Sequence, residues 1–288
     1  MNLSLKVRVL NFFRGVFKIP GLESLLASAT QAKASQHLLA KLVPNPYQYS
    51  PGTFKTITRH GITMRVDISD YIGHYLFFGF KDKGMEKLFS LCKPDSKVLD
   101  IGANIGWTVL NLGRIANKGQ VIGFEPDPYN YERCAENINL NNYPNVRVFP
   151  VGLGNENASV NMEIRTPSNR GGNRISPKNS ESSRKVEIVR LDEFHQVTKI
   201  GQIDLIKMDV EGYELNVLRG AKLLLQKYKP KLFIELDDNN LRDQGDSALM
   251  LIEFLFQVGY TRIEDAETKR SISLQTDFAN CHFDIIAN

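Results

Sequence analysis

A short loop that follows an apolar run has the residue types most suited to chemistry. Residues 97–101 lead into a glycine-containing turn, and a segment with helical periodicity begins at Trp107. Glycines let the backbone approach a ligand closely, and a helix start offers N–H groups that have no intrahelical partner. A strand, a glycine loop and a helix start in this order predict a cofactor cradle. Its candidate residues are Asp100, Gly102, Ala103, Asn104, Gly106 and Trp107.

An acid at the end of the next apolar run supplies the second half of this candidate site. Residues 120–124 precede Glu125 and Pro126, about 20 residues beyond the glycine loop. An acid at the tip of a second parallel strand binds ribose hydroxyls in nucleotide-binding folds. The two features predict a site for an adenosine-containing cofactor. Gly152, after a third apolar run at 146–151, is a further predicted contact.

The spacing within the loop separates two kinds of cofactor. The dinucleotide fingerprint G-x-G-x-x-G would place its second and third glycines at Asn104 and Trp107. S-adenosylmethionine has no pyrophosphate and fits better: it offers a ribose to Glu125, an amino-acid tail to the loop and positive charges to Asp100. A nicotinamide-dependent oxidoreductase is the alternative enzyme class.

A second acidic segment follows the apolar run 203–208. Asp209 and Glu211 should lie at the carboxyl edge of the sheet, where ligands of open α/β folds bind. They are the candidate catalytic residues, as a base or as ligands of Mg²⁺, and Glu235, Asp237 and Asp238 would share the same edge. The plainer interpretations are a solvated acidic rim and, for Glu211, stabilisation of the first turn of a helix over 212–227.

The order of the predicted elements indicates the fold class. Strands and helices alternate from residue 97 onward, which predicts an α/β fold whose parallel sheet has helices on both faces. Predicted strands at 159–164 and 185–191 interrupt this rhythm. The last two, at 261–264 and 283–287, have no helix between them and predict an antiparallel edge.

Several blocks of this sequence resemble the FkbM family of S-adenosylmethionine-dependent methyltransferases. They run in order between about residues 66 and 260: VLDIGANIG at 98–106, GFEPDP at 123–128, VRLDEF at 189–194, IKMDVEG at 206–212, ELNVLRGA at 214–221 and KPKLFIE at 229–235. The resemblance implies a class I methyltransferase fold, which is Rossmann-like with a seven-stranded, mostly parallel sheet. It also implies O-methylation of a hydroxyl on a sugar, glycan or natural product.

The same resemblance gives roles to individual residues. It places Asp209 near the transferred methyl group and Glu125 on the cofactor's ribose. The methionine end of the cofactor would lie against Asp100, Gly102, Asn104 and Gly106. A non-catalytic module that binds S-adenosylmethionine without turnover is a further alternative.

The composition of the chain limits the kinds of partner and compartment that we expect for it. The 288 residues have a net charge of only +4, which does not indicate nucleic acid, and no apolar run is long enough to span a bilayer. Three widely spaced cysteines fit a reducing cytoplasm. We predict a helical extension over 1–55 and a methyltransferase domain over 56–288. The basic, apolar start of the extension is a candidate for peripheral membrane contact.

A hairpin insertion over 154–190 is the candidate lid. Its central loop is rich in cations, which would suit an anionic acceptor. The alternative is a solvated insertion. The charged residues of this loop are Arg165, Arg170, Arg174, Lys178, Arg184 and Lys185, with Glu181 as the one acid.

Overall fold

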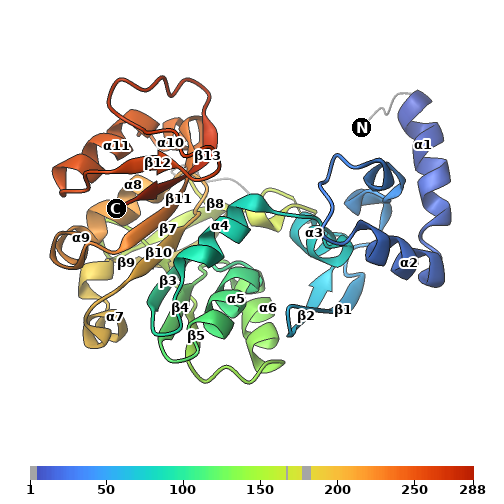
Figure 1. Ribbon diagram of the computed structural model, residues 1–288, viewed down its shortest axis with the longest axis horizontal. Coiled ribbons are helices and arrows are strands. Elements are labelled where there is room, and N and C mark those ends of the chain that lie inside the picture. The colour runs from blue at the N-terminus through green and yellow to red at the C-terminus, as the bar shows by residue number, and fades with distance from the viewer. Residues whose placement is uncertain (1–4, 167, 177–182) are drawn as a thin grey trace. The chain divides into compact units, whose positions relative to one another are not determined.

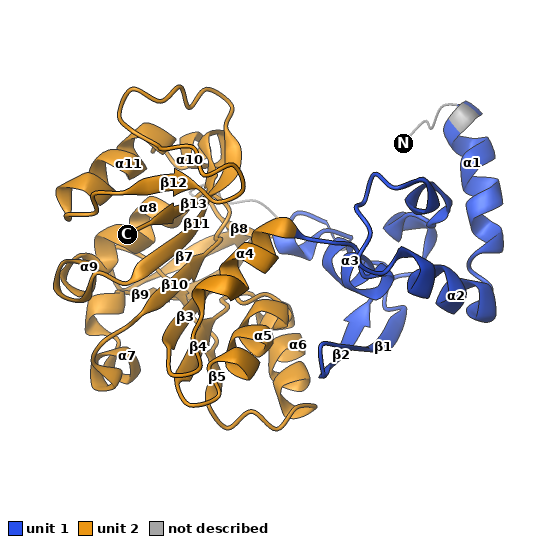
Figure 2. Ribbon diagram, viewed as in Figure 1, with its two compact units in different colours: residues 1–82, 165–171 blue, residues 83–164, 172–288 orange. Residues whose placement is uncertain are grey.

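The computed structural model describes residues 5–166, 168–176 and 183–288 (Figure 1). Contacts divide the chain into two compact units, one of residues 1–82 with 165–171 and one of residues 83–164 with 172–288 (Figure 2). The predicted domain boundary at residue 55 stays a prediction.

The first unit contains helices and one β-hairpin. Strands β1 (Phe54–Arg59) and β2 (Ile62–Asp67) pair antiparallel. Their two-residue turn has positive φ at both positions, 50° at His60 and 78° at Gly61, as tight hairpins require. The helices are α1 (Leu5–Val16), α2 (Pro20–Thr30) and α3 (Tyr71–Phe78), with 3₁₀ turns η1 (Leu38–Leu42) and η2 (Pro46–Gln48).

A mixed seven-stranded sheet forms the centre of the second unit, in the order β12-β13-β11-β10-β3-β4-β5. The neighbours from β11 to β5 pair parallel, whereas β13 runs antiparallel to both β11 and β12. The carboxyl ends of the parallel strands therefore meet at one edge. The strands are β3 (Lys97–Ile101), β4 (Gln120–Phe124), β5 (Val146–Phe149), β10 (Leu205–Met208), β11 (Lys231–Asp237), β12 (Ile263–Asp265) and β13 (His282–Ala287).

Helices cover this sheet, and α4, α5 and α6 lie on the opposite side from α8, α9 and α11 (Figure 1). The apolar strand residues are buried because both faces are covered: Val98, Leu99 and Ile101 of β3 are at most 1% exposed. The helices are α4 (Lys83–Leu91), α5 (Trp107–Ile115), α6 (Pro128–Asn139), α7 (His195–Ile200), α8 (Glu214–Gly220), α9 (Lys222–Tyr228), α10 (Asp238–Asp243) and α11 (Ala248–Gln257).

The single helix expected over 212–227 is wrong in detail, because the chain forms two short helices, α8 and α9, that meet at Ala221. At this break the backbone packs closely against another segment. A Cβ on Gly220 would lie 1.8 Å from the carbonyl oxygen of Gly154. The amphipathic pattern of the sequence continues through this position, so it does not reveal the close backbone contact that breaks the helix.

The insertion forms a small sheet of its own, in the order β6-β9-β7-β8. The two strands expected on either side of the basic loop are present as β7 (Ala158–Glu163) and β9 (Ser183–Val189), which pair antiparallel. The others are β6 (Gly152–Leu153) and β8 (Arg174–Ile175). Lys178 and Glu181 lie outside the described residues.

Candidate functional site

The glycine loop after β3 is held tightly between two neighbouring strands. The N–H groups of Gly102 and Ala103 both donate to the Phe124 carbonyl oxygen at the end of β4, each over 3.0 Å. Gly102 has φ of 81°, and a Cβ there would lie 2.0 Å from the backbone oxygen of Asp209. Only glycine fits this position, because the backbone is left-handed and β10 leaves no room for a side chain.

The second half of the loop leads into α5. Asn104 has φ of 49° and Gly106 has φ of 98°, where a Cβ would lie 3.1 Å from the sulfur of Cys134. Asparagine tolerates this left-handed conformation better than most residues. Gly106 is the N-cap of α5, whose first residue is the half-buried Trp107. The turn thus brings the helix N-terminus to the carboxyl edge of the sheet.

Glu125, at the end of β4, is bonded to the glycine loop. Its two carboxylate oxygens accept from the N–H of Asn104 at 2.8 Å and the N–H of Asp127 at 2.9 Å. Burial raises the pKa of Glu125 to about 7 even though these two bonds oppose the rise. Each oxygen keeps a second lone pair that can accept a ligand hydroxyl.

Pro126 and Gly152 are neighbours at the same edge. A Cβ on the buried Gly152 would lie 3.5 Å from the ring of Pro126, which is itself half-buried. The structure therefore brings every predicted cofactor contact to the carboxyl ends of β3, β4, β5 and β10.

A buried lysine that the sequence analysis gave no role lies at the centre of this edge. The Nζ of Lys207 in β10 donates to the Gly102 carbonyl oxygen at 2.9 Å. It also lies 3.4 Å from Oδ1 of Asp100 and 3.5 Å from Oδ2 of Asp209. Burial disfavours the ammonium, but the two carboxylates outweigh it, so the pKa of Lys207 is raised.

The sequence does contain a signal for Lys207. It stands in an otherwise apolar strand, and lysine is almost never fully buried unless it is paired.

Asp100 is the most completely buried acid of the site, with an exposed fraction of 0%. The side chains of Lys207 and Thr108 face its carboxylate oxygens, with the Lys207 Nζ at 3.4 Å. Burial raises the pKa of Asp100, while the Lys207 ammonium opposes the rise. A buried carboxylate beside the glycine loop attracts a cationic ligand group bound at that loop.

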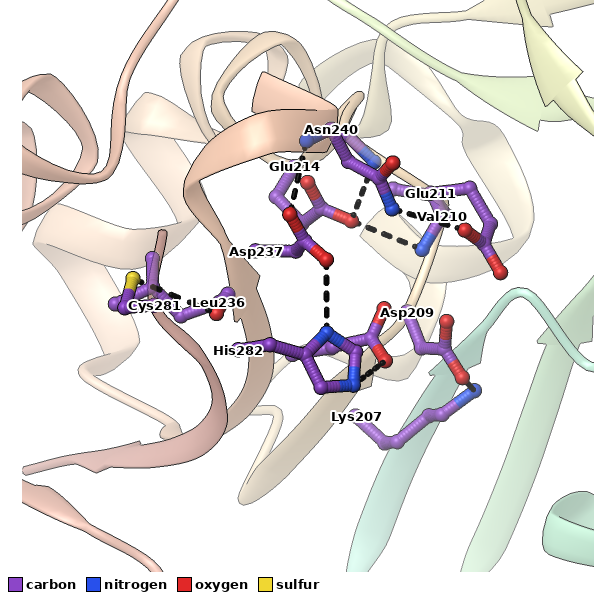
Figure 3. Close-up of polar contacts among 12 residues, drawn as sticks. Lys207, Asp209, Val210, Glu211, Glu214, Leu236, Asp237, Asn240, Cys281 and His282 are labelled. Carbon is purple, nitrogen blue, oxygen red and sulfur yellow. Dashed lines mark hydrogen bonds and ion pairs between the residues drawn. The ribbon is translucent and has the colours of Figure 1, made fainter. Parts of the chain in front are cut away.

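Three carboxylates converge at the ends of β10 and β11: Asp209, Glu211 and Glu235 each place one oxygen within 4.8 Å of the others. Glu211 has φ of 55°, a conformation that costs free energy for a non-glycine residue, and it accepts a hydrogen bond from Asn240 (Figure 3). Burial, followed by repulsion from Asp209 and Glu211, raises the pKa of Glu235 to about 10. These effects favour the protonated form of Glu235, and Nε2 of His282 lies 3.8 Å from its Oε1.

Glu214, the first residue of α8, bonds to the loop that precedes the helix, and stabilisation of the helix by Glu211 stays a prediction. One oxygen of the buried Glu214 accepts the N–H groups of Val210 and Gly212, both at 3.1 Å (Figure 3). Burial raises the pKa of Glu214 to about 7 against these two bonds. Glu211 lies at the site edge, where its Oε2 accepts from Asn240.

The remaining predicted acids have partners of their own, and the partner of Asp237 also lies 3.8 Å from Glu235. Asp238 bonds to Arg242 and to the N–H of Ala248. Asp237 accepts from the N–H of Asn240 and pairs at 2.8 Å with Nδ1 of His282, a second residue that the sequence analysis missed (Figure 3). His282 reaches the site because β13 runs antiparallel and begins at this edge.

A glycine loop, an acid at the next strand end and carboxylates on a third strand define the class of α/β proteins that bind a nucleoside cofactor at the sheet edge. Comparison with known sequences is more specific. The family model "Methyltransferase FkbM domain" matches residues 100–262, more than half of the chain. The chain belongs to the FkbM methyltransferase family, as its motifs predicted.

Two relatives of this chain are methyltransferases with a named position or substrate. The chain is 32% identical over 167 residues to 2-O-methyltransferase NoeI of Sinorhizobium fredii, covering 52% of this chain and 66% of NoeI. It is 29% identical over 182 residues to hexuronic acid methyltransferase AglP of Haloferax volcanii, covering 62% of this chain and 71% of AglP. The chain thus spans slightly less than two thirds of NoeI.

Among solved structures, the chain is similar to an FkbM methyltransferase from Methylobacillus flagellatus. The sequence identity is 18% and the TM-score is 0.45, over 96% of this chain and 62% of that protein.

Proposed function

We propose that this chain transfers a methyl group from S-adenosylmethionine to a hydroxyl oxygen of a sugar or glycan. The observation that carries the proposal is the buried arrangement of Lys207 between Asp100 and Asp209, directly under the glycine loop. It builds a compact polar site at the sheet edge of a methyltransferase-family domain.

The residues at this edge fit the proposed cofactor. Asp100 supplies negative charge beneath the loop for the cofactor's ammonium, and the close approach at Gly102 leaves backbone groups for its carboxylate. Glu125 has free lone pairs for the ribose hydroxyls, and Trp107, Pro126 and Gly152 border the same edge. When bound, S-adenosylmethionine supplies an electrophilic methyl group on a sulfonium.

The chemistry requires the chain to align a hydroxyl oxygen and to accept its proton. We assign this role to Asp209, with Glu211 beside it. The Asp209 side chain is 42% exposed, so an acceptor can reach it, and its Oδ2 lies 3.5 Å from the Lys207 ammonium. The raised pKa of Glu235 favours its protonated form, which would donate a hydrogen bond to the acceptor or to Asp209.

A sugar acceptor with negative charge is the finer part of the proposal. NoeI is a 2-O-methyltransferase, and AglP is a methyltransferase of hexuronic acid, an anionic sugar. In the insertion, Arg184 and Lys185 are exposed, whereas Arg174 already pairs with Glu163 and Asp243. The exposed cations are the better candidates to attract an anionic acceptor.

Magnesium is not needed in this proposal. Lys207 already places a positive charge beside Asp209, and Asp237 and Asp238 are bonded elsewhere.

The decisive experiment incubates the full chain with S-adenosylmethionine carrying a labelled methyl group and a panel of neutral sugars, hexuronic acids and lipid-linked sugars. Mass spectrometry should find one added methyl on a sugar hydroxyl, and D209N should bind the cofactor without turnover. Cofactor binding with no transfer to any acceptor would favour the non-catalytic module. Uptake of a nicotinamide nucleotide instead would favour the oxidoreductase.

A further inference from the structure

The first helix of the chain presents its apolar side outward. Five large apolar side chains of α1 form this outer face, and their exposed fractions range from 47% at Val16 to 77% at Phe12. Their spacing of three and four residues puts them on one side of the helix. The outer face consists of Leu5, Val9, Phe12, Phe13 and Val16.

The opposite side of α1 attaches the helix to its own unit through polar contacts. Asn11 donates to the hydroxyl of Tyr47 at 3.0 Å, and Nε of Arg14 donates to the Lys41 carbonyl oxygen at 2.8 Å. Gln48 donates to the Asn11 carbonyl oxygen at 3.1 Å. These bonds fix the rotation of the helix, so the outer face is directed away from the unit.

This orientation is the reverse of an ordinary surface helix, which buries its apolar side. Leaving several large apolar side chains in water is unfavourable, and contiguous exposed apolar surface marks an interaction site.

Charge indicates which partner fits. Residues 5–50 carry six basic side chains and one acidic one. That acid, Glu23, is 2% exposed and is already paired with Lys55. Arg8, four residues before Phe12 on the same helix, is exposed beside the outer face, whereas Lys18 follows the helix and donates to the Gln48 carbonyl oxygen. A second copy of the chain would bring like charges together, whereas an anionic lipid surface complements both the charge and the apolar face.

We propose that α1 docks this chain on an anionic lipid bilayer, with the outer face in the headgroup region. The helix has 12 residues, and its length of about 18 Å is too short to cross the hydrocarbon core of about 30 Å. No described helix combines the length and apolar character needed to span a bilayer. The docking is therefore interfacial, and it is independent of the proposed reaction.

Vesicle flotation of the full chain tests this proposal. Vesicles of phosphatidylcholine with phosphatidylglycerol should carry the protein upward at low salt, and pure phosphatidylcholine should bind it about tenfold more weakly. F12S/F13S should bind the anionic vesicles about tenfold more weakly. R8E should also bind these vesicles more weakly, and its binding should depend less on salt concentration. The matched control is L223S, which changes an exposed leucine (66%) of α9 in the other unit.

A gain-of-signal variant guards against misfolding. In F12W the new indole should shift its emission to shorter wavelength when anionic vesicles are added, after subtraction of the signal from the parent protein.

The proposal is overturned if the parent protein does not float with anionic vesicles, or if F12S/F13S and L223S bind equally well. It is also overturned if sedimentation shows a concentration-dependent dimer that F12S/F13S abolishes, because the outer face would then bind a second copy.

Discussion

Replacing Lys207 with methionine tests the electrostatic centre of the site. Methionine keeps much of the side-chain volume but removes the ammonium, which leaves the fully buried Asp100 without its compensating charge. At 3.4 Å, two unit charges interact by about 5 kcal/mol at an effective dielectric constant of about 20. The Asp209 contact adds much less to stability because that side chain is 42% exposed.

The net cost is smaller than the Coulomb energy, because burying the ammonium is itself unfavourable. We expect K207M to lower the free energy of unfolding by about 3–5 kcal/mol, as for other buried pairs that lose one partner. D100N in the same background should restore part of this loss, with a coupling of about 1–3 kcal/mol. Urea denaturation followed by circular dichroism measures these values.

The matched control is K231M, at an exposed lysine that begins the neighbouring strand β11 and pairs in register with Leu205. It should change the free energy of unfolding by less than about 0.5 kcal/mol. A loss below about 1 kcal/mol for K207M, or full additivity of K207M and D100N, would refute the charge arrangement.

Four further outcomes are expected. D209N should lower kcat by about 100-fold or more in the labelled-methyl assay while the cofactor Kd stays within about threefold, and an unchanged kcat would contradict its role. G102A should destabilise the protein by at least about 2 kcal/mol in thermal melts and abolish cofactor binding, because its Cβ would lie 2.0 Å from a backbone oxygen. The control G61A shares a positive φ but has no atom within 4 Å of its Cβ, and should cost only about 1 kcal/mol. The raised pKa of Glu214, about 7 when folded, makes the folded state retain a proton. Its contribution to stability is therefore full below about pH 4.5 and is lost as the pH passes about 7. Urea titrations at several pH values measure how steeply the free energy of unfolding falls with pH. E214Q should make this fall less steep by up to about 1.4 kcal/mol per pH unit, and an unchanged slope would be inconsistent with the raised pKa of Glu214. Chelation with EDTA should leave activity within about twofold, and loss of activity restored by Mg²⁺ would show that the acidic cluster binds a metal.

The sequence was sufficient for the parts of the fold that depend on local patterns. The apolar runs at 97–101 and 120–124 are strands because both sheet faces are covered, and the glycine loop follows directly from the first run. Contacts between residues that are distant in the sequence are harder to predict. The sequence does not show that Lys207 reaches Gly102, more than a hundred positions away, or that His282 faces Asp237.

The periodicity of the sequence also does not show which of two nearby glutamates bonds to the backbone and which faces the site. Glu211 and Glu214 both flank the start of α8, yet Glu214 bonds to the backbone N–H groups, while Glu211 adopts a positive φ at the site edge. Glu125 was expected to contact the cofactor, and the structure shows that it also fixes the glycine loop through Asn104.

Calorimetric titration of the full chain with S-adenosylhomocysteine, alongside NADH, distinguishes the two classes of cofactor site. A pocket at the ends of β3, β4 and β10 that is built for a sulfonium nucleoside should give saturable heat with the former ligand and none with the latter. K207M and G102A should lose that heat. Tight binding of NADH together with no response to S-adenosylhomocysteine would contradict this account of the site.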